Sequence, residues 1–298
     1  MNHDPEIAQA SYKKPSSSSR PLILLIHCIA ELVGVFLYVL PGEAATAAFI
    51  LSSATNRPGF GSLLNIAFAY TFGIIIGIIL TAHVSGSHLS PGVSLSFAIF
   101  RGFPKYRVLP YILFQLLGSI LATLVVYGIY GQSLNTLENA LRSNGREDLI
   151  YSSTGPAGVG GFFPGPNQNL GRVFFGEFIA SAVLGLLIFG AIDLRNPLMS
   201  RASIPFIIGI GYFIAIISFG LNTVVLNTAR GLGGQIGTSM IYGGRVFSNH
   251  RYVALATLTN IPATMLGGLV YKLISWHYEE GINANPHPGP NPRKETTD

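Results

Sequence analysis

Charged side chains are scarce in this sequence, and their scarcity excludes most soluble proteins. Asp, Glu, Lys and Arg make up 10% of the 298 residues, whereas hydrophobic residues make up 49%. Mean hydropathy is +0.47. Soluble domains carry about 25% charged residues, so an ordinary soluble enzyme is excluded. The net charge of +5 is read as surface charge and an orientation signal, so we expect no nucleic-acid partner.

Cysteine is almost absent as well. Cys28 is the only cysteine, so no disulfide can form within the chain. No cluster of His and Cys has the spacing of metal ligands. We therefore expect no metal site, no cofactor and no catalytic residues.

What the sequence has is long apolar runs. A helix needs about 20 apolar residues to cross a bilayer core, and six runs meet this length. They are Pro21–Leu40, Ser62–Ala82, Val108–Tyr130, Val173–Ala191, Ile204–Leu221 and Tyr252–Ser275. Two shorter apolar segments, Pro91–Phe100 and Thr228–Tyr242, follow polar interruptions and are too short to span. The predicted fold class is an all-α membrane protein.

The first run could also be a signal peptide, since Lys13, Lys14 and Arg20 precede it. It is too long for the apolar region of a signal peptide, and it contains Glu31. We therefore interpret it as a spanning helix.

Basic residues predict the orientation. An even number of spans places both termini on one side, and cytoplasmic loops are enriched in Lys and Arg. Such residues precede the first, third and fifth runs: Lys13, Lys14, Arg20, Arg101, Lys105, Arg107, Arg195 and Arg201. We expect a disordered cytoplasmic arm at 1–20, an extracellular connecting loop at 131–170 and a disordered cytoplasmic tail at 276–298. The plasma membrane is the expected location.

The sequence contains an internal repeat. "IAELVGVFLYVL", which contains Glu31, is echoed by "GEFIASAVLGLLIFG", which contains Glu177. Glu within a spanning run is costly and usually faces a bundle interior. With three spans per repeat, at 21–130 and 171–275, the second copy must be inverted. Matched breaks in inverted repeats indicate a central solute site, so the two short segments are predicted to be re-entrant half-helices.

The first residues of both half-helices carry polar groups. Ser90 is the predicted N-cap before Pro91, and Asn227 is the N-cap before Thr228. The positive ends of both helix dipoles would meet at the pore centre, where they repel cations and orient water. Arg230 follows close by. It either lines the outer mouth or extends to lipid headgroups, and its place on a re-entrant loop favours the pore.

These segments resemble the major intrinsic protein family of aquaporins and aquaglyceroporins, in a fungal-like form. "SGSHLSPGVS" is similar to the family's SGxHLNPAVT, "LNTARGLGG" to MNPARDLGP, and "AELVGVFL" and "GEFIASAVL" to its two AEFxGT openings. The similarity runs from about Leu22 to Ile274. It implies a passive channel, not an enzyme, assembled as a homotetramer with one pore per chain among membrane lipids.

The family's two Asn-Pro-Ala signatures are altered here. The first is Ser90-Pro91-Gly92 and the second is Asn227-Thr228-Ala229. Ser90 offers one hydroxyl donor in place of the two amide donors of Asn. Gly92 removes a methyl group, and Thr228 lacks the preset φ of proline. We expect a centre that is wider and less strongly polarising.

The resemblance also implies a selectivity filter. Counting back from Ser90 and Asn227 gives Tyr70, Ala215 and Val224, with Arg230 as the fourth member. The loop before Asn227 is about one residue shorter than usual, so Ile214 is an alternative to Ala215. Tyr70 could instead belong to an aromatic belt or a packing ring. Glu31, Glu177 and His88 are expected to brace the re-entrant loops.

The resulting functional hypothesis is a passive channel for water, glycerol and other small neutral solutes. Alternatives are a channel restricted to water or hydrogen peroxide, or a closed channel. A secondary transporter would also use broken helices, but it usually needs an ionisable centre, whereas the central residues here are Ser90 and Asn227.

Overall fold

The computed structural model describes residues 20–56, 61–220 and 224–279, and within these ranges every regular element is a helix. The elements are α1 Arg20–Thr55, α2 Leu63–Ser85, α3 Pro91–Phe100, α4 Lys105–Ser143, η3 Glu147–Tyr151, η4 Pro156–Gly158, α5 Leu170–Ala191, α6 Ile204–Phe219, α7 Thr228–Tyr242, η6 Gly244–Phe247, α8 His250–Leu258 and α9 Asn260–Glu279. The expected arm and tail, apart from Arg20 and 276–279, lie outside the described residues.

The predicted fold class is confirmed, with differences in helix length. α1, α2, α4, α5 and the α8–α9 segment are each long and apolar enough to cross a bilayer. The remaining predicted span, Ile204–Leu221, corresponds to α6, which has 16 residues and ends at Phe219. Leu221 lies outside the described residues. α1 and α4 continue well past Leu40 and Tyr130, the ends set by hydropathy. The first part of the expected 131–170 loop is therefore helical.

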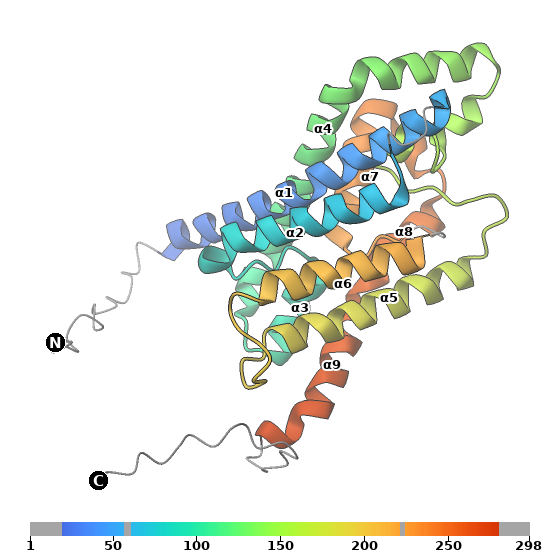
Figure 1. Cartoon of the computed structure of the whole chain (residues 1–298). Helices are drawn as coiled ribbons and strands as arrows, with labels where there is room; N and C mark the ends of the chain where they lie inside the picture. The colour runs from blue at the N-terminus through green and yellow to red at the C-terminus, as the bar shows by residue number, and fades with distance from the viewer. Residues whose placement is uncertain (1–19, 57–60, 221–223, 280–298) are drawn as a thin grey trace, which may run out of the picture.

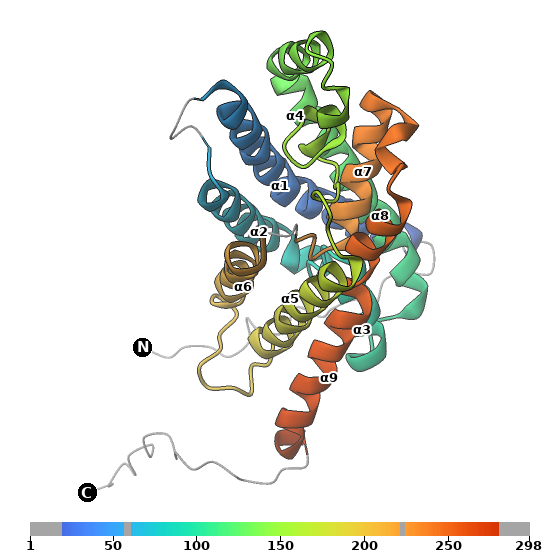
Figure 2. The same ribbon diagram turned by 90° about the vertical axis from the view of Figure 1, so that its right-hand side faces the viewer.

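The helices form two halves that pack against each other. Figures 1 and 2 both place α1, α2, α6 and α5 next to one another in that order, with α2 against α6 joining the halves. Each half-helix packs on a spanning helix of the other half, α3 on α9 and α7 on α4. Because each half-helix packs against the other half, the starts of α3 and α7 lie inside the bundle.

Apolar side chains divide between an interior and an outer surface. An interior cluster contains residues of α1, α2, α5 and α6, among them Val35, Ile74 and Leu184. Other large apolar side chains, such as Phe72, Phe175 and Ile210, point outward and are exposed. An apolar outer surface of this kind suits contact with lipid.

The connection between α5 and α6 is fixed by one carboxylate. Asp193 accepts hydrogen bonds from the backbone and guanidinium of Arg195 and, at 3.0 Å, from the Tyr271 hydroxyl of α9. Hydrogen bonding to Arg195 lowers the pKa of Asp193 to about 2. Asp193 is therefore ionised at neutral pH and ties this loop to α9.

Two glycines allow the closest helix contacts, at corresponding places in the two halves. A Cβ on Gly118 of α4 would collide with the Leu32 carbonyl of α1, and a Cβ on Gly267 of α9 would collide with the Ala182 carbonyl of α5. Small residues at such crossings let helix backbones approach within membranes. α1 and α5, which carry Glu31 and Glu177, are held in place by these contacts.

We predict that Gly118→Ala destabilises the protein by about 1–3 kcal/mol, because the added methyl group must displace the α1 backbone. The matched control is Gly128→Ala on the same helix, where a Cβ meets nothing within 4 Å. This control is expected to be neutral or stabilising by up to about 1 kcal/mol through helix propensity. The melting temperatures of both variants are measured in detergent, with size-exclusion chromatography reporting the fraction of folded protein after heating. Equal melting temperatures would contradict the packing argument.

Candidate functional site

Two buried carboxyl groups hold the two polar breaks in the same way. Glu31 accepts hydrogen bonds from the backbone N–H of His88, at 2.9 Å, and of Leu89, at 2.7 Å. Glu177 accepts them from the N–H of Val225 and Leu226. In both halves the donors stand two and one residues before the half-helix cap. The repeat detected in the sequence is therefore a repeat of hydrogen bonds as well.

These bonds stabilise a backbone conformation that is unfavourable for a side chain such as Leu. Leu89 has φ of 51° and Leu226 has φ of 61°, both in the left-handed region that L-residues rarely occupy. Such strain persists only where neighbouring groups hold it. The carboxyl oxygens hold it here, and the turn aims Ser90 and Asn227 into the bundle.

The two caps differ in their chemistry. Asn227 accepts the Ala229 N–H at 2.8 Å, while its amide nitrogen donates to the Leu89 carbonyl of the other break at 2.7 Å. Ser90 is buried but makes no side-chain cap hydrogen bond. Of the two cap side chains, Asn227 of the second half therefore provides the hydrogen bond that links the two breaks.

Asn260, at the start of α9, accommodates both altered signatures. Its side-chain oxygen accepts from the Thr228 N–H at 3.1 Å and from the Thr228 hydroxyl at 2.9 Å. Proline at 228 would supply neither donor. On the other break, a Cβ on Gly92 would lie 3.3 Å from the Asn260 carbonyl oxygen, so glycine lets α9 approach α3. Sequence reasoning missed Asn260, because no pattern separates it from other polar residues near a helix start.

Arg230 is fixed between two aromatic rings. Its Nε and Nη2 donate to the Tyr70 hydroxyl at 2.9 and 2.8 Å, and its guanidinium lies over the Phe162 ring, 4.1 Å from the centroid. Its Nη1 is buried and has no partner among the described residues. The structure therefore brings Tyr70 and Arg230 together.

These residues line a cavity of about 250 Å³, which we call the outer cavity because the sequence predicts that Arg230 lies near the outer mouth. Val224 and Asn227 also line it, and α6 contributes Tyr212 and Ile216, which share one face of the helix because they are four residues apart. Ala215, 4% exposed, lies in the apolar core beside this face. Ile214 is 47% exposed and points outward. On α6, Tyr212 and Ile216 line this cavity, whereas Ala215 and Ile214 are not among its lining residues.

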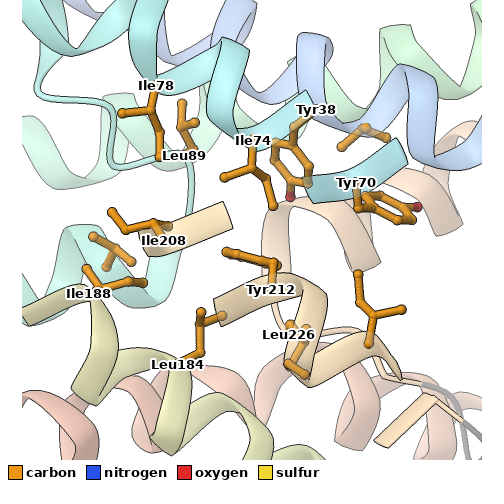
Figure 3. Packing of buried hydrophobic residues seen from close by; sticks show 14 of the residues in the cluster. Tyr38, Tyr70, Ile74, Ile78, Leu89, Leu184, Ile188, Ile208, Tyr212 and Leu226 are labelled. Carbon is orange, nitrogen blue, oxygen red and sulfur yellow. The ribbon is translucent and has the colours of Figure 1, made fainter. Parts of the chain in front are cut away.

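An inner cavity of about 150 Å³ lies on the other side of the breaks. Figure 3 shows its apolar wall, which Ile74, Ile78, Leu89, Ile188 and Ile208 form together from both halves. Gly86, Ser87 and His88 of the first break also line this cavity. Residues of both halves therefore contribute to its lining.

His88 is held by its surroundings. Its Nδ1 lies 3.1 Å from the Ser94 hydroxyl, and its ring contacts Phe97, Phe103 and Tyr111. Packing and hydrogen bonding therefore fix the turn before Ser90 from the side chain as well as from the backbone.

Gln235 supports the outer cavity, and a third glutamate, Glu43, is buried in the bundle; neither was identified from the sequence. Gln235 accepts the Phe162 N–H at 2.7 Å and donates to the Val246 carbonyl at 2.7 Å, so it positions the ring above Arg230. Glu43 is fully buried and accepts from Thr123 at 3.1 Å. Glu43 was missed because hydropathy ended the first span at Leu40.

Comparison with known proteins agrees with this geometry. The Major intrinsic protein family matches residues 18–271. An aquaporin of Laccaria bicolor is 34% identical over 258 residues, 86% of this chain and 84% of that protein. Aquaglyceroporin-2 of Rhizophagus irregularis is 32% identical over 262 residues, covering 87% and 80%. The solved aquaglyceroporin of Plasmodium falciparum superposes with a TM-score of 0.67 at 24% identity, over 85% of this chain and 95% of that one.

We predict that Glu177→Gln destabilises the protein by about 1–3 kcal/mol, because an amide offers one acceptor oxygen and would leave a buried loop N–H unpaired. The loop would also relax, which lowers water permeability per protein. Asp148→Asn is the control, since this carboxylate is 71% exposed and contributes about 0–1 kcal/mol. Melting and stopped-flow water flux in proteoliposomes measure both effects. Wild-type behaviour of Glu177→Gln would refute the bracing role.

Proposed function

The chain belongs to the major intrinsic protein family of membrane channels, which are not enzymes, and on this premise we propose that it conducts glycerol as well as water. The observation that carries the proposal is the outer cavity, which Arg230 lines together with Tyr70, Phe162 and Ile216. A solute there meets hydrogen-bond donors on one side and apolar surface on the other.

Glycerol has a matching surface, with hydroxyl groups along one edge and C–H groups along the other. A solute that sheds its water shell loses free energy unless new hydrogen bonds replace those to water. The Arg230 guanidinium supplies donors, and the aromatic and aliphatic side chains contact the carbon backbone. The relative named Aquaglyceroporin-2 supports this assignment by its name.

Both cavities also suit uncharged solutes. Among the described residues, no Asp or Glu lines either cavity, since Glu31, Glu43 and Glu177 are buried behind the walls. The N-termini of α3 and α7 and the charge of Arg230 all oppose cations. A coupled transporter would need an ionisable or cation-binding centre, so passive conduction is the better account.

We further propose that the chain forms a homotetramer in the plasma membrane with both termini in the cytoplasm. The exposed apolar side chains of α1, α2, α5 and α6 offer a surface for neighbouring copies and for lipid. Arg101, which follows α3, and Lys105 and Arg107, in the first turn of α4, fit the positive-inside pattern. Native mass spectrometry in mild detergent with lipid tests the tetramer, and a monomer would contradict it.

Stopped-flow light scattering on proteoliposomes tests glycerol conduction. With sucrose as osmolyte the signal reports water flux, and with glycerol it reports water efflux followed by glycerol entry. We expect both permeabilities to exceed those of empty liposomes. Water flux without glycerol entry would contradict the proposal and leave a water channel.

We predict that Ile216→Phe lowers glycerol permeability more than water permeability, because a larger ring narrows the outer cavity for the larger solute. The matched control is Ile214→Phe, two residues away on the outward face of the same helix, where a larger apolar side chain contacts lipid. The ratio of the two permeabilities, measured at equal protein density, is the readout. If only Ile214→Phe changes this ratio, the filter position on α6 is misassigned.

A further inference from the structure

Two tyrosines stand between the outer and inner cavities. Among the described residues, only Tyr38 and Tyr212 line both spaces. Tyr38 comes from α1 of the first half and Tyr212 from α6 of the second half. They are 2% and 8% exposed. Figure 3 shows both side chains entering the space between the two halves from different helices.

The two rings contact each other across this space. Their centroids are 6.5 Å apart at an interplanar angle of 45°, and aromatic rings in contact have centroids about 4.5–7 Å apart. A solute therefore cannot pass between the rings as they stand. It must pass beside them or displace one of them.

We infer that Tyr38 and Tyr212 form a second constriction of the pore, in series with the filter at Arg230, and that it limits the size of the solutes conducted. The inference rests on the proposed function in one respect, since it assumes that solutes cross both cavities. It assigns a selective role to two residues that signature motifs do not contain.

The Tyr38 hydroxyl has the chemistry of a contact for passing solutes. It is buried and has no hydrogen-bond partner among the described residues. Buried polar groups are nearly always paired, and an unpaired one is costly. The hydroxyl is not accessible while the ring stands in this position, but when the ring rotates to open the constriction, a water molecule or a solute hydroxyl would supply the missing bond. The constriction is therefore narrow but favours hydroxylated solutes.

The position of Tyr38 is rigid at its backbone. A Cβ on Gly73 of α2 would lie 2.8 Å from the Cα of Tyr38, so α2 packs directly on this turn of α1. The Tyr38 ring also lies 6.3 Å from the Tyr70 ring, which bonds Arg230. Opening the constriction thus requires a side-chain rotation and not a helix movement.

The test compares wild type with Tyr38→Ala and Tyr38→Phe in proteoliposomes, with glycerol and a four-carbon polyol as probes. Tyr38→Ala removes the ring and is expected to raise the permeability of the four-carbon polyol relative to water by about tenfold. Tyr38→Phe keeps the ring and removes the hydroxyl, so the size limit is expected to persist while polyol permeability falls. Tyr106→Ala, at an exposed position, is the control and should match wild type.

If Tyr38→Ala does not yield folded protein, Tyr38→Leu replaces it, with the same expected direction. A folded variant lacking the ring whose permeability for water and both polyols equals that of wild type overturns the inference. Failure of glycerol conduction in wild type is a separate result. In that case the constriction still predicts that removing the Tyr38 ring admits glycerol, and a variant that stays impermeable to glycerol overturns it.

Discussion

Two backbone turns inside a membrane bundle can exist only if their N–H groups find acceptors, because lipid offers none. Glu31 and Glu177 each supply two acceptor oxygens, one for each of the two N–H groups before a half-helix cap. The left-handed Leu89 and Leu226, the direction of α3 and α7 and the position of Arg230 all follow from these four bonds. Burying a carboxyl group inside the membrane costs free energy. The hydrogen bonds that it accepts from the backbone N–H groups offset this cost.

The two halves match in the hydrogen bonds that their glutamates make, but they differ in the cap side chains and in the residues that line the cavities. Asn227 bonds its own helix and the opposite loop, whereas Ser90 is too short to reciprocate. On the outer side the solute path meets Arg230, Tyr70 and Phe162, and on the inner side it meets isoleucines and a polar loop. A strong hydrogen-bond donor, Arg230, thus lies at the outer cavity, and in the proposed pore passage farther in depends on solute size and on the Tyr38 side chain between the cavities.

The sequence predicted the features that follow from local chemistry. Apolar length predicted the spanning helices, and Glu31, Ser90, Glu177 and Asn227 predicted the inverted breaks, because Glu within a span and polar caps before short helices have few other uses. Helix ends at Thr55 and Ser143 were not predictable from hydropathy, since both helices continue into polar residues. Ile216, Phe162 and Tyr38 line the outer cavity through tertiary packing, which counting from a motif along the chain does not reveal.

Asn260 makes the two altered signatures interdependent. Its buried side-chain oxygen accepts from both donors of Thr228, while its carbonyl lies against Gly92. Proline at 228 would remove both donors at once and leave this oxygen unpaired, at a cost of about 1–3 kcal/mol. Alanine at 92 would press on the same residue from the other side. Because all three residues share these contacts, the effects of mutations at 92, 228 and 260 on stability are expected to be non-additive, and the effect of each depends on which residues occupy the other two positions.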